Sequence, residues 1–195
     1  MIEYITGRLA ELTPTSAVVE TGGIGYLVNI TLPTFSSLEG KETAKLLLHQ
    51  VIREDAWQLF GFLTERERSL FRALIGVSGV GANTARMILS SIPAQELERV
   101  IISGDSKSLK KVKGIGSKTA ERVIVDLRDK IVPSDEIELS GAVRTADSEV
   151  MDEALAAMVM LGYPRPAVVK VLKKIFEAEP GVKVEAAIKK ALAMI

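Results

Sequence analysis

Residues 77–85 read Val-Ser-Gly-Val-Gly-Ala-Asn-Thr-Ala, and residues 112–120 read Val-Lys-Gly-Ile-Gly-Ser-Lys-Thr-Ala. The two stretches align without a gap at a spacing of 35 residues, which indicates an internal duplication. Apolar residues with helical spacing follow each copy, at Ile88 and Leu89 after the first and at Val123, Ile124 and Leu127 after the second. The sequence therefore predicts a helix, a glycine hairpin and a second helix, twice in succession.

This pattern points to phosphate binding. Glycine permits backbone angles that a Cβ resists, and it lets another backbone approach closely. The hairpin N–H groups and the N-terminus of the next helix then present partial positive charge. One such hairpin is weak evidence, since packing alone explains many; two in register favour binding. The candidate residues are Gly79, Val80, Gly81 and Asn83 in one copy and Gly114, Ile115, Gly116, Ser117, Lys118 and Thr119 in the other.

The charge pattern agrees with a polyanion partner. The 195 residues include 25 basic and 25 acidic side chains, so the net charge is zero. Residues 63–131 nevertheless carry thirteen basic and eight acidic groups, a net of +5, between two acidic stretches. A basic module suggests a polyanion partner, and contacts to phosphate carry no base information. The two hairpins resemble the tandem helix-hairpin-helix motif of DNA-binding proteins, which implies DNA binding that does not depend on sequence.

Composition excludes several chemistries. The chain has no cysteine and one histidine, His49, which rules out a disulfide scaffold, a thiolate metal site and a multi-histidine zinc site. We expect no catalytic residues, no metal and no cofactor. No apolar stretch approaches the ~20 residues that span a bilayer, and the N-terminus lacks the features of a signal peptide. The expectation is a soluble cytoplasmic protein without a membrane or small-molecule partner.

Two other motifs have simpler explanations. Residues 114–119 faintly resemble a nucleotide-binding P-loop, but Ser117 separates Gly116 from Lys118 and the context is helical. Glu54 and Asp55 could be a metal pair of a nuclease, yet further acidic ligands are not evident nearby. A solvated turn is the ordinary interpretation of such a pair.

The segments on either side of the duplication complete the fold class, an α+β multidomain chain. Residues 1–63 alternate with a period of two, as at Tyr26, Val28 and Ile30, and predict a small OB-like β-barrel of about five strands. Thr64 to Glu67 has the spacing of a capping box and opens an all-α tandem helix-hairpin-helix domain, 64–132. Residues 133–147 are predicted to be a flexible linker, and 148–195 a C-terminal three-helix, UBA-like bundle.

Several stretches together resemble the RuvA family, the Holliday-junction DNA-binding subunits of bacterial branch-migration complexes. They are Met1–Leu9, Gly22–Tyr26, His49–Ala56, Leu59–Phe62, Lys113–Arg122 and Leu161–Tyr163. The resemblance covers the whole chain and adds Arg122 to the DNA-binding residues. It implies a non-catalytic subunit that binds four-way junctions as a homotetramer or an octamer. The implied partners are the RuvB hexameric ATPase and the RuvC resolvase.

The resemblance also assigns two further sites. Glu54 and Asp55 match an acidic pin at the junction centre, where their charge would repel phosphates. The last module would dock the ATPase, with Met158, Leu161 and Tyr163 as candidates. For Met158 and Leu161 a place in the core of the bundle is an equally good interpretation, because both belong to one helical stripe with Leu155.

Two other classes of function remain open from sequence. One is a structure-specific nuclease or glycosylase that carries helix-hairpin-helix elements, although a catalytic constellation is not evident. The other is a DNA clamp or scaffold without preference for junctions.

Overall fold

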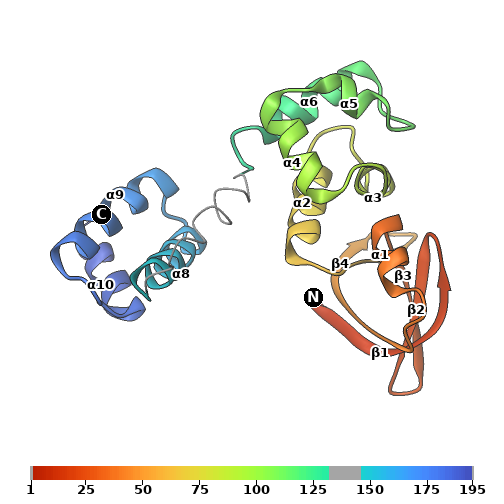
Figure 1. Cartoon of the computed structure of the whole chain (residues 1–195), viewed down its shortest axis with the longest axis horizontal. Coiled ribbons are helices and arrows are strands. Elements are labelled where there is room, and N and C mark those ends of the chain that lie inside the picture. Colours follow the sequence, from red (N-terminus) through yellow and green to blue (C-terminus); the bar gives the residue numbers. More distant parts are fainter. Residues whose placement is uncertain (1, 132–145, 195) are drawn as a thin grey trace. The chain divides into compact units, whose positions relative to one another are not determined.

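The computed structural model describes residues 2–131 and 146–194. The chain divides into two compact units, Met1–Ser134 and Asp135–Ile195, and each is described here by itself. Figure 1 shows the first unit as a β-barrel with a layer of helices, and the second as a separate helical bundle. Among the described helices, none is long and apolar enough to cross a bilayer.

The barrel is built from five strands within residues 2–131. They are β1 (Tyr4–Thr13), β2 (Ser16–Thr21), β3 (Ile24–Asn29), β4 (Thr43–Ile52) and β5 (Trp57–Phe62). The sheet closes in the order β1-β2-β3-β5-β4, with β3 and β5 parallel and the other pairs antiparallel. Helix α1 (Leu32–Leu38) joins β3 to β4. This confirms the predicted OB-like barrel.

The alternation in the sequence decides which side of each strand faces inward. Ala17 and Val19 on β2 are buried, as are Leu46 and Leu48 on β4, while their neighbours are more exposed. A tight turn joins β2 to β3. Both Gly22 and Gly23 have positive φ and form the turn alone, because their conformation lets the strands pair up to Thr21 and Ile24.

The helical layer begins where the predicted capping box lies. The helices are α2 (Glu65–Ile75), α3 (Ala82–Ser91), α4 (Ala94–Ser103), α5 (Ser106–Lys110) and α6 (Ser117–Leu127). The Thr64 hydroxyl accepts from the Glu67 N–H at 3.2 Å, and the Glu67 carboxylate accepts from the Leu63 N–H at 3.2 Å. Side chains thus satisfy one N–H of the first turn of α2 and the N–H of the residue that precedes its N-cap.

Strand β5 ties the barrel to the helices. Leu59 belongs to the barrel core, whereas Phe60 and Phe62 belong to the core of the helical layer. The ring of Phe71 on α2 lies 5.0 Å from that of Phe60 and 4.9 Å from that of Phe62, centroid to centroid. Aromatic pairs at this separation contribute packing energy beyond their buried area.

Two arginines fix the layers further. Arg68 of α2 is buried and donates to the Glu3 and Leu48 carbonyls of the barrel, at 2.9 and 3.4 Å. Arg86 of α3 donates to the carbonyls of Thr15 and Ile30, at 3.0 and 3.3 Å. The glycine hairpins are therefore held in a defined position relative to the barrel.

The described part of the second unit, residues 146–194, consists of α8 (Ala146–Met160), α9 (Arg165–Ala178) and α10 (Val184–Met194). Its core includes Leu155, Met158, Val168 and Leu172. Helix α8 begins two residues before the predicted start of this module, at 148. Residues 133–145 of the predicted linker lie outside the described residues, and the module boundaries stay predictions.

Candidate nucleic-acid interface

The two copies of the duplicated sequence adopt the same backbone geometry. Gly79 has φ +90° and Gly114 has φ +89°. The N-cap residues that follow, Gly81 and Gly116, have φ/ψ of −84°/168° and −81°/167°. Helix α3 starts at Ala82 and α6 starts at Ser117, again 35 residues apart. The duplication read from the sequence is a structural duplication.

The hairpin glycines divide into two kinds. Gly79 and Gly114 have backbone angles that other residues rarely adopt, so the turn requires them. Gly81 and Gly116 have ordinary extended angles, and a Cβ at either would meet nothing within 4 Å. The fold does not require glycine at these two positions. What their bare backbone provides is open space in front of a helix N-terminus.

Backbone hydrogen bonds show which N–H groups face that space. The N–H of Val80 donates to Val77 O at 3.0 Å, and that of Ile115 donates to Val112 O at 3.1 Å. The first bond within each helix runs from Ala85 to Gly81 and from Ala120 to Gly116. Residues 82–84 and 117–119 thus form the first turns, whose N–H groups have no partner within the helix. Neither Gly81 nor Gly116 supplies a side-chain cap.

Val80 and Ile115 therefore differ from the prediction that they contact phosphate. Their side chains are buried in the core of the helical layer, and their N–H groups close the hairpin. They anchor the loop, and the exposed glycines, Asn83, Ser117 and Lys118 are left at the surface.

A hollow connects the two copies. It has a volume of about 330 Å³, and its lining comes from both motifs: Ser78, Gly79, Lys118, Thr119, Glu121 and Arg122. The first hairpin and the first turns of α6 thus share one concave surface, although they are distant in sequence. Two exposed cations and bare backbone suit an anion here, and the charge of Glu121, the carboxylate in the lining, is offset by the Lys110 ammonium 3.6 Å away.

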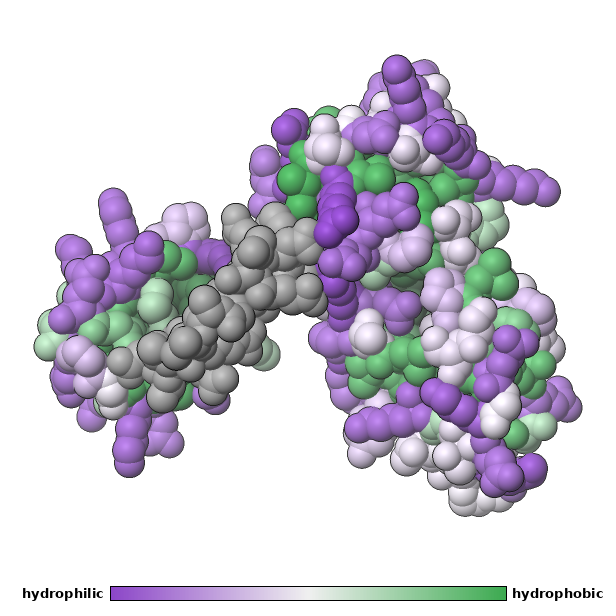
Figure 2. All heavy atoms as spheres, viewed as in Figure 1, coloured by the Kyte–Doolittle hydropathy of each residue, from purple (hydrophilic) through white to green (hydrophobic). Residues whose placement is uncertain are grey.

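The cations around this hollow come from the second copy. Lys107, Lys110, Lys111 and Lys113 are exposed on α5 and the following hairpin, with Lys118 and Arg122 on α6. Figure 2 shows hydrophilic side chains projecting from this region of α5 and α6. The first copy has Asn83 where the second has Lys118, and Arg86 of the first copy is occupied with barrel carbonyls. The net charge of the module is therefore concentrated on one hairpin.

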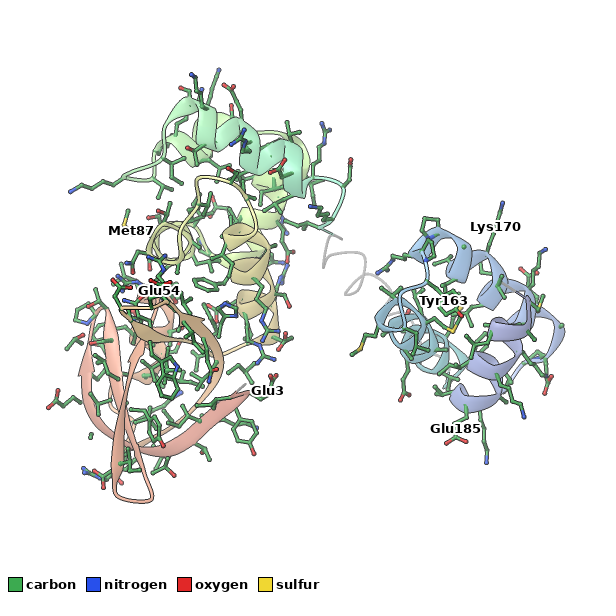
Figure 3. All side chains as sticks on the ribbon, turned by 180° about the vertical axis from the view of Figure 1, so that it is seen from behind. Glu3, Glu54, Met87, Tyr163, Lys170 and Glu185 are labelled. Carbon is green, nitrogen blue, oxygen red and sulfur yellow. The ribbon has the colours of Figure 1, made fainter. Side chains whose placement is uncertain are left out.

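Glu54 and Asp55 form the exposed tip of the β4–β5 hairpin. The Arg53 N–H donates to Ala56 O at 2.8 Å, and the Ala56 N–H donates back to Arg53 O at 3.4 Å, which closes the turn. Figure 3 shows Glu54 at the end of the barrel from which the helical layer continues. Among the described residues, His, Asp and Glu side chains nowhere gather in a group of three that could hold a metal ion.

Comparison with known proteins decides the family. A family model described as "RuvA N terminal domain" matches residues 1–61, "SAM-like Helix-hairpin-helix tandem" matches 71–129, and "RuvA, C-terminal domain" matches 149–195. The chain is 48% identical over 98% of its length to a protein of Bacteroides thetaiotaomicron, of which it covers 98%. It is 49% identical to one of Parabacteroides distasonis and 46% to one of Porphyromonas gingivalis, over the full length of each pair. All three are named "Holliday junction branch migration complex subunit RuvA".

The chain belongs to the RuvA family. This confirms the resemblance inferred from the sequence, and it places the tandem helix-hairpin-helix in the stretch where the duplication was found. The roles of individual residues of this RuvA-family chain rest on the geometry above and stay predictions.

The predicted docking residues of this RuvA-family chain fall in three different environments. Met158 is fully buried in the core of the second unit, so it cannot contribute an exposed docking surface; the core interpretation is right for it. Tyr163 is half-buried against the same core. Leu161 lies just beyond α8 and is 61% exposed. It does not continue the buried stripe of Leu155 and Met158, because the helix ends at Met160 and Gly162 follows with φ +96°.

Sequence reasoning missed several exposed apolar residues in this RuvA-family chain. Met160 is 89% exposed beside Leu161, and Val159 is also exposed. Ile52 and Trp57 flank the acidic tip and are both exposed. For the hairpin the sequence did contain a signal. A tryptophan two residues after Asp55 lies at the start of a strand next to a polar turn, where the strand is leaving the core and its side chains become exposed. Exposure itself depends on the packing.

Proposed function

We propose that this protein binds four-way junction DNA without sequence preference, as a homotetramer or an octamer, and recruits a hexameric ATPase of the RuvB kind for branch migration. The observation that carries the DNA-binding part is the pair of N-cap glycines that the fold does not require. A phosphate can approach the N-terminus of a helix closely when the residue before it has no side chain in the way. The relatives named as junction branch-migration subunits support the choice of a junction.

Each hairpin would hold a phosphate of the DNA backbone. The first-turn N–H groups of α3 and α6 supply the donors, and Lys118 and Arg122 add positive charge around the shared hollow. Two hairpins in fixed relative position match successive phosphates of a duplex better than one. Since contacts of this kind read no base edges, affinity depends on the shape of the DNA and on salt.

The acidic tip supplies selectivity by repulsion. A carboxylate and a phosphate 4 Å apart repel each other by about 1 kcal/mol in bulk water, and by more near a protein surface. Four copies around a crossover would bring together about eight carboxylates, Glu54 and Asp55 of each, which disfavours a continuous duplex across the centre. Separated strands are then directed outward to the hairpins.

The second unit is proposed as the ATPase-docking module, and the protein itself as non-catalytic. Support comes from its own core and from the exposed apolar run Val159, Met160 and Leu161 at the end of α8. Exposed apolar residues in sequence suit a protein partner better than DNA. RuvC-type resolvase is a further proposed partner, on the strength of the family alone.

The first experiment is a binding titration. The purified chain is titrated against an immobile four-way junction and a linear duplex of equal length, at a stated salt near physiological and without metal. A large preference for the junction supports the proposal, whereas equal affinity reduces the protein to a general duplex binder. Cleavage of the junction on adding Mg²⁺ would instead favour a nuclease.

The double variant Glu54→Gln with Asp55→Asn tests the acidic tip in the same assay. It removes the charge and keeps the shape, so we expect duplex to bind several-fold more tightly and the junction preference to shrink. Duplex affinity equal to or weaker than that of the unaltered chain would contradict the repulsion argument. Glu96→Gln, an exposed carboxylate on α4, is a matched control for loss of a surface charge.

A further inference from the structure

Two large apolar side chains stand directly below the acidic tip. Ile52 ends β4 and is 70% exposed, and Trp57 begins β5 and is 64% exposed. They are paired across the hairpin, as the last pair of the β4–β5 ladder. The proposed role of Glu54 and Asp55 accounts for the tip and leaves this pair unexplained.

The pair is a preformed surface. Arg53 and Ala56 exchange both backbone hydrogen bonds, so the next pair along, Ile52 and Trp57, is a non-hydrogen-bonded pair. Side chains of such a pair approach most closely and lie on one face of the hairpin. The pairing places Ile52 beside the indole on that face, and the closed turn fixes the backbone that carries both side chains.

The charge of the tip restricts what that ligand can be. Carboxylates repel a phosphate backbone, but they do not repel the neutral face of a nucleobase. Carboxylate oxygens also accept hydrogen bonds from the exocyclic amino groups of bases. A strand near this tip is thus favoured when its phosphates point away and a base points toward the hairpin. An exposed indole is the side chain that stacks best on such a base.

The size of the pair also favours a base over a protein partner. An aromatic side chain buries at most ~250 Å², and a stable protein interface needs ~800 Å² from each partner. Two side chains at a narrow tip with two carboxylates beside them provide far less. A nucleobase is about the size of the indole that would stack on it.

We propose that Trp57, supported by Ile52, stacks on an unpaired base at the centre of the junction and so stabilises the separated strands. The inference rests on the proposed junction binding and deepens it: repulsion by Glu54 and Asp55 opens the crossover, and the indole holds a base once it is unpaired. Trp57 is then a specificity-determining residue for open junctions.

The chain contains a single tryptophan, so intrinsic emission reports on this position alone. The full chain is titrated with a four-way junction while DNA anisotropy records binding in the same cuvette. We expect Trp57 emission to be quenched in proportion to bound junction. A linear duplex, saturated at lower salt, should quench it much less, because its bases are paired.

Variants give a second readout. Trp57→Ala should weaken junction binding by about tenfold, within the range that base–aromatic stacking supports, with a smaller effect on duplex. Trp57→Phe keeps an aromatic face and should stay near the affinity of the unaltered chain. Gln58→Ala, at the adjacent position on the opposite face of β5, is the matched control and should have no effect.

The outcomes separate this inference from the proposed function. Junction preference without any change of Trp57 emission overturns the stacking and leaves the function standing. A change of emission with protein concentration in the absence of DNA, with no further change when the junction is added, assigns the pair to a contact between copies and also overturns the stacking. If the junction is not preferred at all, the proposed function fails, and quenching by a single-stranded oligonucleotide still decides whether Trp57 stacks on bases.

Discussion

Gly81 and Gly116 occupy N-cap positions where serine would stabilise a helix better than glycine. A serine hydroxyl there would accept from the N–H of the second or third residue of the helix. Those N–H groups are the ones proposed to bind phosphate. The bare N-cap is therefore a place where stability and binding demand different residues.

The paired variant Gly81→Ser with Gly116→Ser tests this conflict. Since a Cβ meets nothing within 4 Å at either position, we expect the free energy of unfolding to stay the same or rise by a few tenths of a kcal/mol. Junction affinity should fall several-fold, because the hydroxyl competes for the donors. Urea unfolding and anisotropy measure the two effects. If the paired variant were more stable but bound the junction with unchanged affinity, the hairpins would not be the DNA-binding site.

Gly79→Ser is the contrasting variant. Because Gly79 has φ +90°, serine there should lower the free energy of unfolding by about 1 kcal/mol.

His49 is the one histidine, and it lies half-buried on β4 against the ring of Phe71, 5.4 Å away. Burial, with added repulsion from Arg72 and Arg68, lowers the pKa of its imidazole below 6.5. Its Nδ1 atom is buried without a hydrogen-bond partner. The native state therefore favours the neutral ring.

The lowered pKa of His49 makes the stability of the protein depend on pH. Between the lowered native pKa and 6.5, the unfolded chain binds more protons than the native one, so stability falls as the pH falls through this window. We expect the free energy of unfolding, from urea curves, to decrease from pH 7 to pH 5. His49→Gln should flatten this dependence. If the free energy of unfolding of the variant depended equally on pH, a group other than His49 would be responsible. Glu3 and Asp105, whose pKa values are lowered by hydrogen bonds from Arg68 and Ser108 respectively, affect stability only below about pH 4.5.

At the scale of elements, α2 is the link between the barrel and the hairpins. Its first turn is closed by Thr64 and Glu67, and its buried face meets β5 through Phe71. The sequence predicted this helix well because a capping box and a 3.6-residue stripe are local signals. It did not predict that β5 would contribute to two cores, since that depends on what each face of the strand meets.

Thr64→Ala removes the hydroxyl that caps α2. We expect a loss of about 1 kcal/mol in the free energy of unfolding, seen as a lower urea midpoint with an unchanged slope. Thr64→Ser retains the acceptor and should recover most of the loss. If the serine variant were as unstable as the alanine variant, packing of the threonine methyl rather than the cap would be responsible.

At the scale of the whole molecule, both proposed DNA sites lie in the first unit. The hairpins, the hollow and the acidic tip all belong to residues 2–131, and the first unit has its own hydrophobic cores. The second unit has a separate core of its own. Binding of DNA and docking of an ATPase should therefore be separable by truncation.

The truncated chain 1–134 tests that separation. We expect it to unfold cooperatively in urea and to bind a four-way junction within about twofold of the full chain, while stimulation of a RuvB-type ATPase is lost. Circular dichroism controls for folding. Loss of junction binding by a folded truncation would show that the second unit contributes to the DNA site. In the full chain, Met160→Ser, at the most exposed large apolar side chain of the described residues, should lower stimulation of the ATPase and leave junction binding unchanged.

The sequence by itself determined the duplicated hairpins, the change from strands to helices at Thr64, and the family. The first two depend on local rules, namely glycine conformations, side-chain periodicity and capping, which neighbours in sequence decide, whereas the family was inferred from the resemblance of several stretches along the chain. It also located the acidic tip, because a polar pair between two apolar alternating runs marks a hairpin.

Only the tertiary structure decided which side chains are free to act. Met158 is buried and Leu161 is exposed, although the helical stripe includes both. Arg86 counts toward the basic module yet bonds to barrel carbonyls, and Ser78 and Arg122 line one hollow that no linear pattern predicts. The exposure of Trp57 likewise depends on the packing and could not be established from the sequence alone. Burial and long-range contact are properties of how elements pack, and packing is settled by all the surfaces together.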